Sequence, residues 1–133
     1  SKQSVLIVED EESLLELLVH RFKKAGYSVH TATDGARACE KIGKRRPDII
    51  LMDVMLPRLN GLEVLEMLRN HPDAAISKIP VIMATAQTTP DTLEKSLQLG
   101  ADSFYYKPYS IADLILCTGA LLNKYRGSAP VPA

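Results

Sequence analysis

The sequence is poor in cysteine, has no excess of charge of either sign and contains no long hydrophobic run. Its two cysteines, Cys39 and Cys117, lie far apart and show no C-x-x-C or Cys/His spacing, so we expect small core residues and no redox motif or thiolate metal site. No tract is long and apolar enough to span a membrane or to act as a signal peptide, which makes the cytosol the expected compartment.

The charge balance excludes another class of function. Sixteen basic residues match sixteen acidic ones, so no net field would attract the chain to nucleic acid or to anionic lipid. The basic run from Lys44 to Arg46 precedes Pro47 and is interpreted as the solvated end of a helix. We therefore expect no direct nucleic-acid partner and no membrane association.

The length of 133 residues is enough for one domain with a core of its own. After Arg126 the sequence reads GSAPVPA, which is proline-containing and has no hydrophobic period. We expect a folded domain over residues 1–126 and a flexible tail or truncated linker over residues 127–133.

Five segments have the patterns of β-strands. Residues 5–8, 49–52 and 81–84 are apolar throughout, which suits strands covered on both faces of a parallel sheet. The stretches that start at Tyr27 and Ser103 are more mixed and are typical of edge strands.

Helical patterns separate these segments, so five strands alternate with five helices. The clearest pattern is an apolar stripe that begins at Leu14, continues through Leu18 and Phe22, and stops before Gly26. The other four helices are indicated by their N-terminal signals: Asp34, Asn60-Gly61, Thr89 before Pro90, and Ser110 with Asp113 three residues later.

Strands that alternate with helices predict an α/β fold, a doubly wound parallel sheet with helices on both faces. Placing the three apolar strands in the middle gives the order 2-1-3-4-5, which is the flavodoxin-like arrangement. In this order the chain reverses direction between strands 1 and 3, and ligands bind at their carboxyl ends. We therefore expect chemistry where strand 1 runs into Glu9 and Asp10 and strand 3 runs into Asp53.

Carboxylates that meet at one sheet edge raise one another's pKa values unless a cation joins them. Mg²⁺ is suited to such a site because it takes oxygen ligands and is commonly bound by one or two carboxylates plus a phosphate. We expect Asp10 and Asp53 as direct ligands, Glu9 as a ligand through water, and Met55 as a ligand through its backbone carbonyl.

Two further side chains should reach the same crevice. Thr85 ends strand 4 and Lys107 ends strand 5, and both can bind a phosphate oxygen, one through a hydroxyl and one through an ammonium group. With the metal they would surround a phosphoryl group on Asp53, whose carboxylate can act as a nucleophile. Phosphoryl transfer needs mainly positioning and charge neutralisation, which this set supplies.

Each of these residues alone has a simpler explanation. The acids at 9–12 would favour the start of a helix, Asp53 could cap a turn, and Lys107 before Pro108 could belong to an ordinary turn. Thr85 could be a buried hydroxyl with an internal partner. The site hypothesis is favoured because all these residues fall at the carboxyl ends of strands that hydrophobicity predicts independently.

The chain resembles the receiver domain of bacterial two-component response regulators over residues 4 to about 125. The resemblance rests on the pair Glu9-Asp10, on DVMLPRLNG from Asp53, on ATA around Thr85 and on GADSFYYKP from Gly100. It implies a switch in which Asp53 accepts a phosphoryl group from a sensor histidine kinase or phosphotransfer protein.

The resemblance also implies roles around that acceptor. Glu9, Asp10 and Asp53 would hold Mg²⁺, while Lys107 and Thr85 would contact the phosphoryl oxygens.

The resemblance further implies a switch and its geometry. Thr85 would shift toward the phosphate while Phe104 turns inward, which changes the face made by helix 4, strand 5 and helix 5. The peptide between Lys107 and Pro108 is expected to be cis. Phe104 stands where the chemotaxis member has tyrosine, so the switch must rely on packing; a plain core role for Phe104 is the alternative.

Two positions bear on how long the phosphoryl group survives. Met55 and Gln87 occupy the places that tune hydrolysis in the family, and neither supplies a carboxylate to orient water. We expect slow autodephosphorylation and no enzymatic turnover of other substrates; the alternative is that both are surface residues of no consequence.

Four other functions are alternatives to this switch. A Mg²⁺-dependent phosphatase of the haloacid dehalogenase type would need an aspartate at position 55, and a flavin module would need a glycine- and hydroxyl-rich loop after strand 1. A histidine phosphotransfer bundle centred on His20 conflicts with the strands, and a degenerate receiver that acts only as a binding module stays open.

The partners stay open too. The signal could leave through an output protein, a missing output domain or a homodimer. The three histidines are expected at the surface or at a sheet edge, and Tyr106 is expected as an exposed contact. Leu93, Leu97 and Leu114 are expected in the core.

Overall fold

A computed structural model of the chain describes residues 2–86 and 89–127. Its strands form one parallel five-stranded sheet in the order β2-β1-β3-β4-β5, which confirms the predicted flavodoxin-like topology. The strands are β1 (Ser4–Val8), β2 (Ser28–Ala32), β3 (Ile49–Asp53), β4 (Val81–Thr85) and β5 (Ser103–Tyr106).

The register of the sheet brings the predicted site residues to one edge. Val8 of β1 pairs with Met52 of β3, so the residues that follow these strands leave the sheet side by side. Asp53 pairs with Ala84, and Thr85 pairs with Tyr106. The carboxyl ends of the four strands β1, β3, β4 and β5 therefore meet at the edge where the chain reverses direction.

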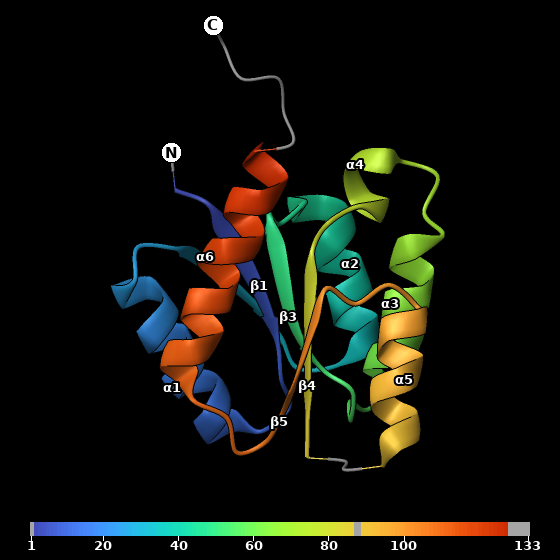
Figure 1. Cartoon of the computed structure of the whole chain (residues 1–133), viewed down its shortest axis with the longest axis horizontal. Helices are drawn as coiled ribbons and strands as arrows, with labels where there is room; N and C mark the ends of the chain where they lie inside the picture. Colours follow the sequence, from blue (N-terminus) through green and yellow to red (C-terminus); the bar gives the residue numbers. More distant parts are fainter. Residues whose placement is uncertain (1, 87–88, 128–133) are drawn as a thin grey trace, which may run out of the picture.

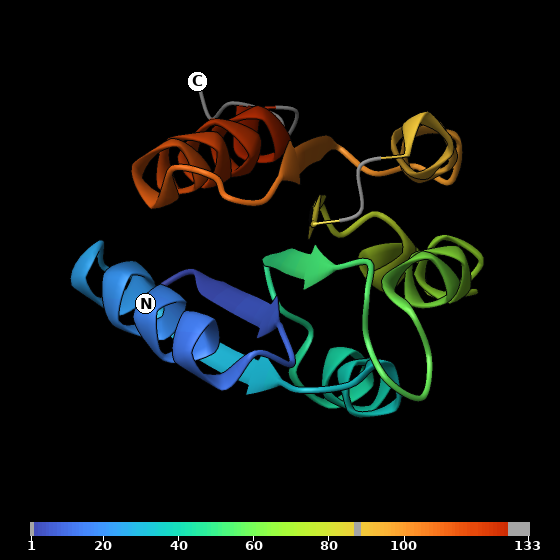
Figure 2. The same cartoon turned by 90° about the horizontal axis from the view of Figure 1, so that it is seen from below.

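The helices cover both faces of the sheet (Figures 1 and 2). On one face lie α1 and α6, and on the other lie α2, α3, α4 and α5. The helices are α1 (Glu12–Lys24), α2 (Gly35–Arg45), α3 (Gly61–Arg69), α4 (Ala74–Ser77), α5 (Pro90–Gln98) and α6 (Ile111–Gly127).

Three of the four predicted helix starts are confirmed by side-chain caps, while Thr89 precedes Pro90 at the start of α5 without a side-chain cap bond. The side chains of Asp34 and Asn60 accept hydrogen bonds from the backbone N–H groups three residues later, and Ser110 accepts one from Asp113. After α1 the chain turns at Gly26, whose φ of 102° lies in the left-handed region that glycine adopts without steric cost.

Two expectations about the helices are wrong. The chain has a sixth helix, α4, a single turn that begins after Asp73, whose carboxylate accepts from the N–H of Ala75. Leu97 is 52% exposed, because α5 turns Thr92 and Ser96 inward instead. Among the leucines expected in the core, Leu114 is fully buried.

Alternate residues of the central strands feed two separate hydrophobic clusters. Leu6, Ile50 and Met83 pack toward the face covered by α2, α3 and α5. Val5 and Ile82 pack toward the face covered by α1 and α6. Both faces of the middle strands are therefore buried, which explains their unbroken apolar runs.

Some expectations fall outside the described residues. Gln87 and residues 128–133 are among them, while α6 continues through Gly127, one residue past the expected domain end. Within the described residues, no helix is both long and apolar enough to cross a membrane.

Candidate functional site

Three carboxylates converge at the carboxyl ends of β1 and β3. Glu9, Asp10 and Asp53 each offer an oxygen that lies within 4.8 Å of the others. Glu9 and Asp53 are buried, whereas Asp10 is exposed. A set of hard oxygen ligands with one solvent-facing member fits a Mg²⁺ ion that keeps part of its water shell, so this cluster could hold such a metal.

Lys107 is the cation of this cluster. Its Nζ lies 2.7 Å from Glu9 Oε1 and 2.5 Å from Asp53 Oδ2, so one ammonium group bridges both buried carboxylates. Burial acts to lower the pKa of Lys107, but its hydrogen bonds to Asp53 and Glu9 outweigh burial and raise that pKa above its ordinary value. The lysine is therefore charged at neutral pH.

The raised pKa of Glu9 reflects the burial of two acids side by side. Burial raises the pKa of Glu9, while the hydrogen bonds from Lys107 and from the N–H of Glu11 oppose that rise. Asp53 adds a like charge that raises the pKa further. Lys107 thus carries much of the charge compensation in a site with two buried acids.

The loop after β3 is held tightly against Asp53. The N–H of Met55 donates to Asp53 Oδ1 at 2.9 Å, which orients the carboxylate. Gly61 begins α3 so close to this strand that a Cβ there would lie 2.2 Å from the Asp53 carbonyl oxygen. Only glycine fits at this position, and the NG pair at 60–61 is therefore part of the site's framework.

The remaining predicted residues lie on β4, on β5 and directly after β5. Thr85 is completely buried at the end of β4, and its carbonyl accepts from the N–H of Lys107, which extends the β4–β5 pairing up to the site. Phe104 is partly buried against the core and meets the more exposed Tyr106 edge-on, with ring centroids 5.0 Å apart. The peptide between Lys107 and Pro108 is cis, as expected.

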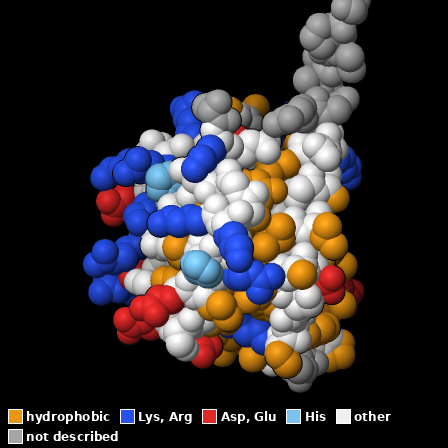
Figure 3. Space-filling view, turned by 90° about the vertical axis from the view of Figure 1, so that its left-hand side faces the viewer, with side chains coloured by type: hydrophobic (Ala, Val, Ile, Leu, Met, Phe, Trp, Pro, Cys, Tyr) orange, Lys and Arg blue, Asp and Glu red, His pale blue; other side chains and the backbone are white. Residues whose placement is uncertain are grey.

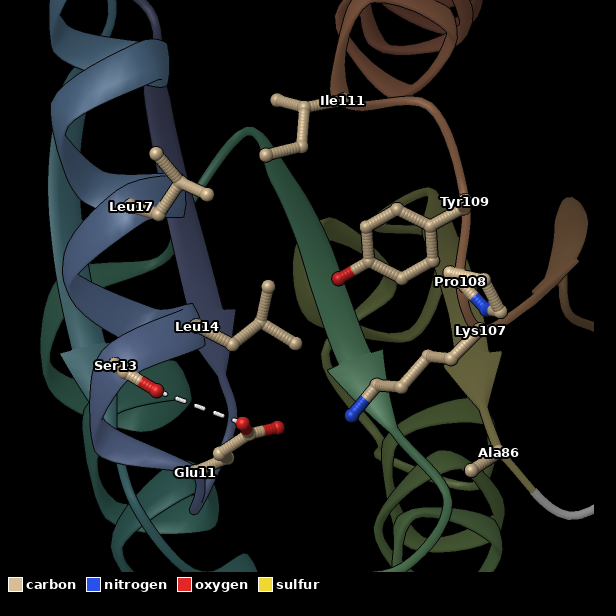
Figure 4. Close-up of a pocket in the computed structure, with 9 residues that line it drawn as sticks. All are labelled: Glu11, Ser13, Leu14, Leu17, Ala86, Lys107, Pro108, Tyr109 and Ile111. Carbon is tan, nitrogen blue, oxygen red and sulfur yellow. Dashed lines mark hydrogen bonds between the residues drawn. The ribbon is translucent and has the colours of Figure 1, made fainter.

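A groove beside the site escaped the sequence interpretation. It has a volume of about 670 Å³, and Leu14 and Leu17 of α1 point across it toward Tyr109 and Ile111 (Figure 4). Burial raises the pKa of Tyr109 to about 12, so its hydroxyl stays protonated at neutral pH. Leu17 is 47% exposed, and an apolar residue off the buried stripe of an amphipathic helix is the signal that could have indicated this groove.

This geometry can do one kind of chemistry well. The Asp53 side chain is fixed by a backbone N–H, two further acids lie beside it for a cation, and an ammonium group faces them. Such a centre can accept a phosphoryl group on a carboxylate oxygen and neutralise its charge. The residue two places after Asp53 is Met55, which is 57% exposed and cannot act as acid or base.

Comparison with known proteins agrees with this geometry. The sequence model of the response regulator receiver domain family matches residues 5–117. The chain is 37% identical over 128 residues to the alkaline phosphatase synthesis transcriptional regulatory protein PhoP of Bacillus subtilis, covering 96% of this chain and 52% of PhoP. It is 41% identical over 121 residues to the sensory transduction protein RegX3 of Mycobacterium tuberculosis, covering 91% and 51%.

Solved structures give the same result for the fold. A CheY-like response regulator receiver domain protein from Methanospirillum hungatei aligns with a TM-score of 0.90 and 26% identity, over 97% of this chain and all of that one (100%). The alignment therefore covers the whole of that receiver protein. By contrast, this chain spans about half the length of the curated relatives PhoP and RegX3.

Proposed function

Because the chain belongs to the receiver domain family of two-component response regulators and so acts in phosphorylation-dependent signalling, we propose that Asp53 is its phosphoacceptor. The observation that carries this proposal is the single lysine between two buried acids, Glu9 and Asp53, at 2.7 and 2.5 Å. A lysine placed there neutralises the resting carboxylates and lies ready for a phosphoryl oxygen.

In the proposed transfer, an Asp53 carboxylate oxygen attacks phosphorus as the bond from phosphorus to the donor's imidazole nitrogen breaks. The donor histidine, which carries a proton on its other ring nitrogen, leaves as neutral imidazole, and an aspartyl phosphate remains. Lys107 then exchanges its contact with Asp53 for one with a phosphoryl oxygen, and the Thr85 hydroxyl donates to another. No general base is required because the nucleophile is already ionised.

The proposed metal site uses the residues at the end of β1 together with Asp53. Asp10 and Asp53 would be direct Mg²⁺ ligands, Glu9 would act through water, and the Met55 carbonyl would complete the protein's share. The metal would supply charge neutralisation for the incoming phosphoryl group. The clustering of carboxylate oxygens within 4.8 Å supports this ligand set.

The proposed readout lies on the face made by α5, β5 and α6. This is the face predicted from the sequence as helix 4, strand 5 and helix 5, a count that omits the short helix α4. Movement of Thr85 toward the phosphate would let Phe104 turn further into the core. Tyr106, 39% exposed and in contact with Phe104, would then change its surroundings. We infer that this face carries the signal to an output domain, an output protein or a second copy in a homodimer.

We propose that the groove between α1 and the loop after β5 receives the phosphodonor. Its apolar walls are exposed beside the site, so a helix of a histidine kinase or phosphotransfer protein could bury them while bringing its phosphohistidine to Asp53. Leu17→Asp should then reduce transfer from such a protein but not phosphorylation by acetyl phosphate. The matched control is Leu116→Asp on α6, which alters an equally apolar and more exposed (72%) position.

Output and lifetime complete the proposal. PhoP is named a transcriptional regulatory protein, and this chain matches about half of it, so a regulator built from this receiver and a separate output domain is the form we propose. Within the cytoplasm, such a receiver would turn over no substrate other than its own phosphoryl group. Met55, an exposed residue without a carboxylate, supports slow autodephosphorylation.

The proposal is tested by the intact mass of the protein after incubation with acetyl phosphate and Mg²⁺, beside Asp53→Ala. We expect one phosphoryl adduct on the native chain and none on the variant. An adduct of equal yield on Asp53→Ala would contradict the assignment.

A further inference from the structure

We propose that the flank formed by the end of α1, the outer edge of β2 and the end of α2 docks an acidic, extended segment of a partner protein. The four cations that define this basic flank are Lys23, Lys24, Lys41 and Arg45. The surface is separate from the acceptor site, and the inference does not depend on the proposed function.

The zero net charge of the chain conceals a strong segregation of charge. Eight of the sixteen basic residues lie within residues 20–46, where Asp34 and Glu40 are the only acids. Figure 3 shows Lys, Arg and His side chains gathered over one part of this side of the molecule, with acidic side chains at its left edge and lower in the view. A surface with this local excess attracts anions although the whole protein does not.

The ion pairs of this segment involve basic residues outside the basic flank. Elsewhere in the same segment Arg37 pairs with Asp34, Lys44 with Glu40, and Arg46 with Asp73. Over the described ranges 2–86 and 89–127, none of the four cations of the basic flank has a carboxylate within ion-pair distance. Their charges are therefore available to pair with the carboxylates of a bound partner.

The shape of the flank indicates what it can take. A groove of about 510 Å³ runs between α1 and β2, with Leu15, Val19 and Val29 as apolar lining and His20 and Lys23 as polar lining. Glu16 and Thr31 complete that lining. An apolar lining with cations beside it fits a segment that alternates apolar and acidic side chains.

The cations of α2 act on the same strand. The ammonium group of Lys41 donates to the Thr31 carbonyl on β2. Burial lowers the pKa of His30 on β2, and the charges of Arg45 and Lys41 lower it further. Because side chains alternate along a strand, His30 lies on the α2 side of β2, whereas Val29 and Thr31 line the groove on the α1 side. The cations of α2 therefore flank the same edge strand from the face opposite the groove.

The occupant that fits best is a polypeptide. β2 is an edge strand, so its outer N–H and C=O groups are open to an added strand, once Lys41 moves from Thr31 to an incoming carboxylate. A nucleic acid offers no apolar side chains for Leu15 and Val29, and a flat bilayer cannot enter a groove. Helix C-termini favour cations, which accounts for Lys23 and Arg45 but not for the missing acids or the groove.

The test uses a fluorescein-labelled peptide in which Glu alternates with Val, with binding followed by fluorescence anisotropy. A triple variant, Lys23→Glu with Lys41→Glu and Arg45→Glu, reverses the charge of three of the four cations of the basic flank. The control, Lys78→Glu with Lys95→Glu and Lys124→Glu, makes the same change in net charge elsewhere on the surface. Circular dichroism and urea denaturation establish that both variants fold.

We expect the native protein and the control to bind the peptide with an affinity that falls as salt is added, and the triple variant to bind about tenfold more weakly or worse. Equal binding by the triple variant and the control would overturn the proposal. So would tighter binding of a mixed-sequence DNA duplex or of phosphatidylserine vesicles than of the peptide, or no binding by the native protein at low salt.

Discussion

Replacing Lys107 by methionine removes the cation that joins Glu9 and Asp53, while methionine keeps most of the side chain's apolar length. The two carboxylates are 4% and 5% exposed, and the lysine is 17% exposed. In the native protein the Lys107 Nζ lies 2.7 Å from Glu9 Oε1 and 2.5 Å from Asp53 Oδ2. Without this ammonium group, two buried carboxylates of like charge remain with no cation between them.

The expected loss follows from that burial. Removing one partner of a buried ion pair lowers the free energy of unfolding by about 3 to 5 kcal/mol. We expect the lower value because the exposed Asp10 keeps the cluster open to solvent. About 3 kcal/mol corresponds to a fall in melting temperature of roughly 10 °C for a chain of this size. Lys44→Met is the matched control, since its pair with Glu40 is 73% and 62% exposed and should contribute at most about 0.5 kcal/mol.

Mg²⁺ and pH distinguish lost charge compensation from lost packing. Mg²⁺ should replace the missing charge and restore about 2.7 kcal/mol at 100 times its dissociation constant. Glu9 already has a raised pKa, and losing Lys107 raises it further. Between pH 4.5, the ordinary pKa of Glu9, and its raised pKa, the folded Lys107→Met variant keeps a proton on Glu9 that the unfolded chain has lost. The stability of the variant therefore falls as pH rises through the raised pKa.

Urea denaturation followed by circular dichroism, at several pH values with and without Mg²⁺, measures all three effects. The reasoning is refuted if Lys107→Met is no less stable than Lys44→Met. It is also refuted if the loss is unchanged by both Mg²⁺ and pH, because that result would indicate a packing defect.

Three further predictions concern the framework and the chemistry. Arg69→Met should cost about 3 kcal/mol in urea denaturation, because the Arg69 guanidinium donates to three backbone carbonyls and to Asp102; a loss below 1 kcal/mol would contradict it. Gly61→Ala should cost about 2 kcal/mol and slow phosphorylation, since its Cβ would meet the Asp53 backbone; unchanged rates in acetyl phosphate would oppose this. Met55→Asn should shorten the phosphoryl half-life in a phosphate-release assay, and an unchanged half-life would count against tuning at this position.

Much of the fold follows from local sequence patterns. The central strands are unbroken apolar runs because both their faces are buried, and the helix starts carry side-chain caps at Asp34, Asn60 and Ser110. The position of the site follows too, because parallel strands deliver their carboxyl ends to one edge, and Lys107 lies beside Glu9 and Asp53 there.

What the sequence missed depends on contacts between distant segments. The single turn of α4 is too short for a periodic pattern, and its C-terminal carbonyl at Ser77 is held by Arg69 from α3. Leu97 looked like a core residue, but α5 packs through Ser96, whose hydroxyl bonds to the Thr92 carbonyl within the helix. The groove beside the site joins Leu17 to Tyr109, which no local pattern connects.

The central claim is that Asp53 carries the phosphoryl group in a Mg²⁺-dependent reaction. Sodium borohydride reduces an aspartyl phosphate to homoserine, so peptide mass spectrometry after treatment with acetyl phosphate and borohydride locates the modified residue. We predict homoserine at position 53 with Mg²⁺, and little or none when the metal is chelated or in Asp10→Asn. Homoserine at another acid, or equal conversion of position 53 without Mg²⁺, would contradict the account.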